Sequence, residues 1–196
     1  MKKLVKLKRE ECLSLYPKFP VADYLREQFD FPDIFKSYFL SIAPKPRTKY
    51  IKALSFALSN LVEELGYEFL VFLGDGKTPW LYRCVENQGK PKPISEALDY
   101  FSNKKIGARF NGALRLDVSE VKEFIEHLYW LTSCNAALPI FHFMDGGENI
   151  LGSICQYGTL HFNTLNSETD NRFNKLIGQA MLPFLLNDRC DKAFGK

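Results

Sequence analysis

Two short turns, each containing glycine and each set between apolar runs, constrain most strongly how this chain can fold. They have the sequences GDGK and DGGE and lie at 74–77 and 145–148. Turns of this composition between apolar runs predict β-hairpins, and the strands of a hairpin are antiparallel. We therefore expect a central antiparallel sheet. The predicted strands are 67–73, 80–85, 108–116, 138–144, 150–156 and 159–164.

Apolar residues at helical spacing predict helices before, between and after these strands. The clearest helix covers 48–65 and is followed by Gly66, a typical C-terminal stop. Further helices are expected at 94–101, at 118–133 after the capping residue Asp117, and from Asn166 onward. The inner face of the last helix would consist of Phe173, Leu176, Ile177, Ala180, Met181 and Phe184. This order predicts an α+β fold in which helices pack on a sheet of five to six strands.

The first 46 residues differ from the rest because prolines interrupt them repeatedly. Proline is excluded from helix interiors, so only short helices are expected there, at 9–15, 21–29 and 34–42. We predict a helical N-terminal extension at 1–46 and an α+β domain at 47–196.

Composition excludes several classes of protein. Of the 196 residues 46% are hydrophobic, and the net charge is +3, which argues against disorder and does not indicate a nucleic-acid partner. No stretch approaches the roughly 20 apolar residues of a membrane span, and no apolar run follows the basic start, so we expect a cytoplasmic protein. The five cysteines have no CxxC spacing, which indicates reduced thiols.

The basic start of the chain is the one uneven feature of the charge distribution. It consists of Lys2, Lys3, Lys6, Lys8 and Arg9. We interpret it as a solvated terminus; the alternative is an arm that contacts phosphates or an acidic partner.

The C-terminal part of the chain resembles the GAF domain, a sensor fold related to PAS. The resemblance rests on Ala137-Leu138-Pro139-Ile140, the turn Asp145-Gly146-Gly147, the strand Ile150-Leu151-Gly152-Ser153-Ile154 and a final helix with Gln179-Ala180. It covers about 48–186. It implies a regulatory domain without catalytic activity that binds a small molecule between the sheet and the helices near 94–104 and 118–133. It also implies dimerisation through the long terminal helices. It does not identify a cofactor.

Four residues are the candidates for the polar lining of such a pocket: Tyr82, Arg109, Asn111 and Cys134. Arg109, Asn111 and Arg115 share one face of a predicted strand, where they would bind an anion or form an ordinary outer face. Cys134 is either a reactive thiol at the edge of a site or a small buried hydrophobic residue. Cys155 lies within an apolar strand and is interpreted as a core residue.

Other motifs give weaker indications of chemistry. Gly76-Lys77-Thr78 lacks the glycine and the following helix of a phosphate-binding loop, and Ser153 is not in a nucleophile elbow. His142 and His161 lie on separate predicted strands and could face the same side. A metal there would need a third ligand such as a carboxylate; Asp145 is near but on a turn. His127 is expected on a solvated helix face.

Two alternatives to a sensor stay open. The first is an interaction protein, such as an immunity protein or an accessory subunit, which would bind its partner through the aromatic leader at 13–42. The positive net charge argues against neutralisation of a basic nuclease. The second is an enzyme with Cys134 as its nucleophile.

Overall fold

The computed structural model describes residues 3–23, 28–43, 45–84, 91–179 and 182–190. The elements of these ranges are, in chain order, β1 (Leu4–Leu7), α1 (Arg9–Leu15), β2 (Val21–Asp23), β3 (Gln28–Asp30), β4 (Lys36–Ser41), α2 (Arg47–Glu64), β5 (Phe69–Gly74), α3 (Lys92–Asn103), β6 (Ala113–Asp117), α4 (Val118–Thr132), β7 (Phe141–Asp145), β8 (Ile150–Ile154), β9 (Leu160–Thr164), α5 (Ser167–Gly178) and β10 (Leu185–Asn187).

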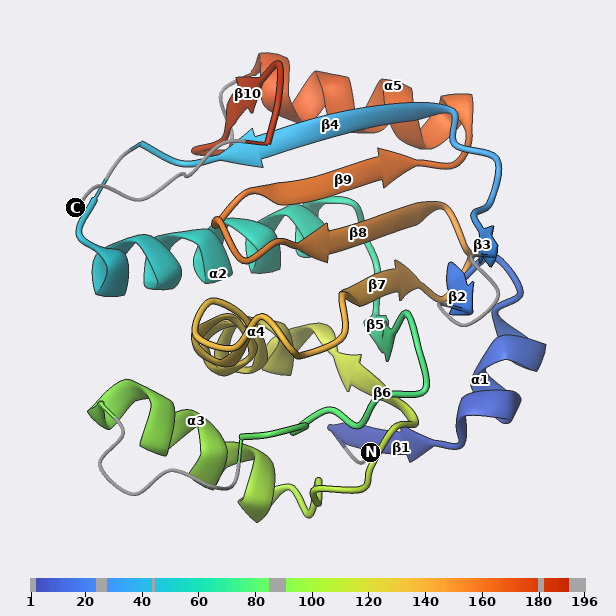
Figure 1. Cartoon of the computed structure of the whole chain (residues 1–196). Coiled ribbons are helices and arrows are strands. Elements are labelled where there is room, and N and C mark those ends of the chain that lie inside the picture. Colours follow the sequence, from blue (N-terminus) through green and yellow to red (C-terminus); the bar gives the residue numbers. More distant parts are fainter. Residues whose placement is uncertain (1–2, 24–27, 44, 85–90, 180–181, 191–196) are drawn as a thin grey trace.

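Within these ranges one sheet holds eight strands in the order β1-β6-β5-β7-β8-β9-β4-β10, and a small second sheet pairs β2 with β3 (Figure 1). All neighbouring strands are antiparallel. The α+β class with a central antiparallel sheet is therefore confirmed. The sheet exceeds the expected five to six strands because residues 1–46 contribute β1 and β4 to it and the C-terminal segment contributes β10.

Helices α2, α3, α4 and α5 contribute to one core on a single face of the sheet. Helix α4 packs against both α2 and α3 (Figure 1). Alternate strand residues such as Phe72 and Phe143 point into this core, and Phe173 of α5 stacks on Phe162 of β9 with ring centroids 4.7 Å apart. Each large apolar side chain buried in this way stabilises the fold by about 1.5–3 kcal/mol.

The opposite face of the sheet is covered only in part. Its apolar residues Val71, Leu73 and Met144 pack against Cys12 of α1 and against Phe19. The buried side chain of Arg9 donates hydrogen bonds to the carbonyl oxygens of Gly74 (2.7 Å) and Asp75 (3.0 Å), which holds α1 at the end of β5. Beyond β8 this face carries mainly polar residues, among them His161 and Asn163 of β9, with Phe39 of β4 beside His161.

After α1 the described residues of the N-terminal segment form strands and no helix. The helix at 9–15 is confirmed, but the helices expected at 21–29 and 34–42 are wrong, because these residues contain β2, β3 and β4. Residues 24–27 lie outside the described part. In β4, Tyr38 and Leu40 are buried on the helix-covered side while the intervening Phe39 is half-buried, so apolar residues on both faces hide the strand's period of two.

The first predicted hairpin is also wrong, whereas the second is confirmed as β7 and β8. Strand β5 pairs with β6 and β7, and the run at 80–84 is a turn. That run is apolar because Trp80 is buried and its Nε1 donates to the carbonyl oxygen of Gly112 at 2.8 Å. Residue 85 lies outside the described part. The strand expected at 108–116 begins only at Ala113.

Basic residues at the start of the chain contact other parts of the folded protein. Lys3 lies 3.5 Å from the carboxylate of Glu120, and Lys6 Nζ donates to the carbonyl oxygen of Lys105 at 2.8 Å. Lys2, like the predicted helix-face residues Ala180 and Met181, lies outside the described residues. Among the helices described, none is long and apolar enough to cross a membrane.

Candidate functional site

A pocket of about 520 Å³ lies where β7 begins and β8 ends. The loop between α4 and β7 and the turn between β8 and β9 form its walls, and Phe31, which precedes β4, lies at its rim. Its apolar lining consists of Phe31, Ala136, Leu138, Pro139, Ile140, Ile154 and Tyr157. Its polar lining consists of Thr132, Asn135, His142, Ser153, Cys155, Gln156, His161 and Cys190. The pocket therefore combines apolar walls with a set of converging polar groups.

The strand register sets the order of the polar groups. His142 of β7 pairs with Ser153 of β8, and Ser153 pairs with His161 of β9. Directly paired residues of antiparallel strands share a face of the sheet. The prediction that His142 and His161 face the same side is therefore confirmed, with Ser153 between them.

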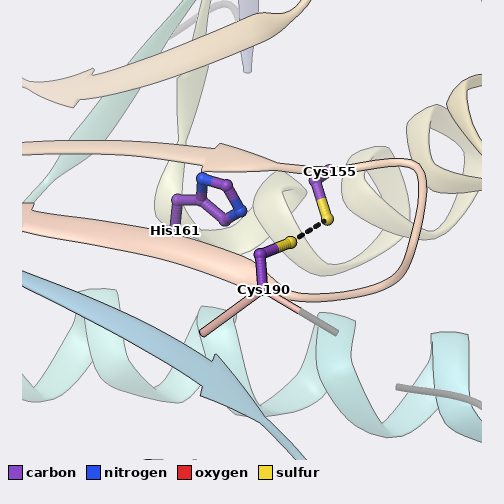
Figure 2. A group of neighbouring side chains, drawn as sticks. All are labelled: Cys155, His161 and Cys190. Carbon is purple, nitrogen blue, oxygen red and sulfur yellow. Dashed lines mark hydrogen bonds between the residues drawn. The ribbon is translucent and has the colours of Figure 1, made fainter. Parts of the chain in front are cut away.

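Two thiols and an imidazole gather at one end of this row (Figure 2). Cys155 follows β8, and its backbone N–H donates to the carbonyl oxygen of Thr159 across the turn, so that Cys155 and His161 are diagonal neighbours on one face. Cys190 follows β10, and its Sγ lies 3.3 Å from Sγ of Cys155. One ligand atom from each of the three residues lies within 4.8 Å of the other two.

The surroundings of Cys155 favour its thiolate. Burial raises the pKa of the thiol, but the neighbouring imidazole of His161, the Cys190 thiol and the backbone of Tyr157 and Thr159 outweigh burial and lower the pKa to about 7. Near neutral pH about half of the Cys155 side chains would then carry a negative charge. The expectation that Cys155 is a core residue is wrong, because its side chain is only partly buried and lines the pocket.

His142 is held in its neutral form. Its side chain is 8% exposed, and burial lowers its pKa to about 4; the charge of Asp75 opposes this shift, and His161 adds to it. The ring of Phe31 meets the imidazole edge-on, with centroids 6.5 Å apart. At neutral pH His142 therefore offers the pocket one hydrogen-bond donor and one acceptor without a charge.

The four residues expected to line a pocket lie elsewhere. Tyr82, Arg109, Asn111 and Cys134 are all exposed, and none of them lines this pocket. Asn111 Nδ2 donates to the carbonyl oxygen of Lys77 (3.3 Å). Arg109 lies in the turn just before Asn111. Tyr82 and Cys134 lie close to the pocket wall, since Asn135 Nδ2 donates to the carbonyl oxygen of Tyr82 at 2.9 Å.

The structure also gives Cys134, His127 and Asp145 surroundings that differ from those expected. Cys134 is not a buried hydrophobic residue, because it is exposed and its Sγ lies 3.2 Å from the guanidinium of Arg47. His127 is not on a solvated face, because it stacks on Tyr100 with centroids 4.3 Å apart. The carboxylate of Asp145 is buried and accepts hydrogen bonds from Gly147 N, Asn149 N and Nδ2, and Ile150 N, so it builds the turn between β7 and β8.

The space expected to hold a ligand, between the sheet and the helices α3 and α4, is occupied by aromatic side chains. The rings of Trp80 and Phe101 lie 6.3 Å apart, and those of Phe101 and Phe124 lie 5.6 Å apart. All three side chains are buried. A pocket between the sheet and these helices would require this cluster to move.

Comparison of the chain with protein-family models, curated proteins and solved structures gave no match. The geometry of the pocket is therefore the basis on which a function can be inferred.

Proposed function

We propose that this protein is a regulatory domain without catalytic activity, and that it binds a small molecule in the pocket at the start of β7 and the end of β8. The observation that carries the proposal is the convergence of His142, Ser153 and His161 on an apolar-walled pocket. Its volume of about 520 Å³ falls in the range of roughly 300–1,000 Å³ that is typical of small-molecule sites. The proposal keeps the role implied by the resemblance to GAF sensors and assigns it to different residues.

The lining suggests the chemical class of the ligand. Apolar walls favour an apolar body, and the neutral His142 beside Ser153 favours a carbonyl, hydroxyl or amide group at one end. The partly ionised Cys155 disfavours an anionic group close to it. Dimerisation through the terminal helices α2 and α5 belongs to the same proposal, and sedimentation analysis would measure it.

The test is thermal unfolding of the purified chain against a small-molecule panel that includes cyclic nucleotides, amino acids and tetrapyrroles. A ligand at 100 times its dissociation constant adds about 2.7 kcal/mol, and each kcal/mol raises the melting temperature of a domain of this size by about 2–4 °C. Ser153→Leu, which fills the pocket, should abolish the shift. Ser119→Leu, on an exposed position of α4, should retain it. Equal shifts in the two variants would contradict this location of the site.

The second candidate function is a protein-interaction module. It is favoured by apolar side chains exposed in the leader: Phe31 is 59% exposed, Ile34 40% and Phe35 55%. Exposed aromatic residues are typical anchors of interfaces. If the panel gives no shift, affinity capture with the parent protein and with Phe35→Ser tests this candidate, because only the parent should retain the partner.

A further inference from the structure

We propose that Cys155, His161 and Cys190 bind a zinc ion whose fourth coordination position opens into the pocket. This inference goes beyond the proposed function, because the three residues would bind the ion whether or not an organic ligand enters the pocket. They come from three separate segments: the turn that follows β8, the start of β9 and the chain after β10.

The geometry of the three residues approaches that of a zinc site. With Zn–S bonds of about 2.3 Å and tetrahedral angles, two sulfur ligands lie roughly 3.8 Å apart. The two sulfur atoms here are 3.3 Å apart, and the three ligand atoms fit within 4.8 Å of one another. Side-chain rotations that open the sulfur pair by about half an ångström would complete the tetrahedral arrangement.

His161 distinguishes a metal site from a mere contact between two thiols. Its Nε2 is buried, and no hydrogen-bond partner for this atom exists among the residues described. Figure 2 shows the edge of the imidazole directed toward the two sulfur atoms. The ring of Phe39 packs edge-on against His161, with centroids 5.0 Å apart, and limits rotation of the imidazole. A buried polar atom without a partner is costly, and a metal ion at this position would satisfy it.

The ligand set selects the class of metal. Two thiolates and an imidazole suit zinc, whereas calcium and magnesium require oxygen ligands. Sites with four protein ligands are typically structural, and sites with three leave a position for water or substrate. All three residues line the pocket, so the remaining position would face the pocket interior.

The competing chemistry is a disulfide between Cys155 and Cys190. It would remove two electrons and two protons from the thiol pair and require a separate oxidant. It would not satisfy Nε2 of His161, which is why the structure favours the metal. The two possibilities give different results in the same experiment.

The experiment uses the full chain, reduced and stripped with a chelator, and titrates it with Co²⁺ as a spectroscopic probe before competition with Zn²⁺. We expect one equivalent of Co²⁺, with near-ultraviolet thiolate-to-metal bands and the strong visible bands of a tetrahedral site, and displacement by Zn²⁺. Cys155→Ser, Cys190→Ser and His161→Gln should each weaken or abolish the spectrum. Cys134→Ser, at an exposed thiol outside the pocket, is the matched control and should leave it unchanged. Circular dichroism verifies that each variant is folded.

Three results would overturn the proposal. The first is that the reduced, folded parent binds neither metal. The second is that the thiolate bands persist in both Cys155→Ser and Cys190→Ser, which would place the metal elsewhere. The third is that peroxide links Cys155 to Cys190 while the reduced protein takes up no metal, which would identify a redox pair instead.

Discussion

The buried imidazole of His142 should make the protein lose stability as the pH falls from about 7.5 to about 5. The folded state holds this group neutral, with burial lowering its pKa from 6.5 to about 4. The unfolded chain exposes it, so it regains its ordinary pKa. A base whose pKa is depressed in the folded state binds its proton preferentially in the unfolded state. Stability is therefore lost as the pH falls through about 6.5, and the loss levels off below about 4.

The magnitude follows from these two pKa values. At about pH 5 roughly 97% of unfolded chains carry the proton, against roughly 9% of folded chains, which corresponds to a loss of about 2 kcal/mol relative to about pH 7.5. Near pH 5 the result depends mainly on the pKa of the unfolded state, because the folded state is still almost entirely neutral. Two kcal/mol is a large part of the usual stability of a domain, which is about 5–15 kcal/mol.

The assay is urea unfolding of the chelator-treated protein at the two pH values, for the parent and for His142→Gln. The variant removes the titrating group and retains a neutral polar side chain, so its pH dependence reports all other groups, including His127 and the carboxylates. We expect the parent to lose about 2 kcal/mol more than the variant over this range. An equal loss in the two proteins would refute the assignment of a buried neutral imidazole at position 142.

Two further predictions concern the core and the thiol. Gly152→Ala should destabilise the protein by about 1–3 kcal/mol in urea unfolding, because the added methyl group would overlap the buried ring of Phe143. The control is Gly178→Ala, whose methyl group would meet no atom within 4 Å and should not destabilise the protein. Equal destabilisation by the two substitutions would contradict this packing. In the metal-free protein, alkylation of Cys155 should rise to half its maximum near pH 7, and His161→Gln should move that midpoint upward because the imidazole lowers the thiol's pKa. Peptide mass spectrometry measures the rate, and an unchanged midpoint in the variant would exclude His161 as the cause.

The elements that the sequence predicts well are those whose signals are local. Helices α2 and α4 bury one side only, and Asn166 caps α5 by accepting a hydrogen bond from Thr169 N at 2.8 Å. The hairpin of β7 and β8 is fixed by its turn, where Asp145 accepts four hydrogen bonds. Each of these signals lies within a few residues of the element that it specifies.

The errors occur where distant contacts decide the structure. Trp80 is in a turn because Phe101, Phe110, Phe124 and Phe141 surround it, and nothing in the run at 80–84 distinguishes such a turn from a buried strand. The run at 34–42 becomes β4 because β9 and β10 pair with it on its two edges. The paired residues are far apart in the sequence, as Leu40 with Leu160 and Leu185 with Ser41 show. Such distant partners cannot be recognised from the residues next to the strand.

Only part of the candidate site could be predicted from the sequence. Cys155 and His161 flank a short turn between two apolar runs, and this spacing is a local signal that places both on one face of a hairpin. Cys190 has no comparable signal. Cys190 lies 35 residues after Cys155 in the sequence. It reaches Cys155 because β10, which precedes it, pairs with the edge of β4.

The position of the thiol cluster follows from how unevenly the sheet is covered. The cover formed by α1 and Phe19 ends near β8, and beyond it the exposed face continues through His161 to the edge strand β10. The chain before β10 is anchored by the buried Leu182 and Phe184, but the three residues of β10 are all exposed. A zinc ion bound by Cys155, His161 and Cys190 would therefore connect this edge to the centre of the sheet. Because metal binding is coupled to folding, its free energy would stabilise mainly the docking of the C-terminal segment and much less the aromatic core.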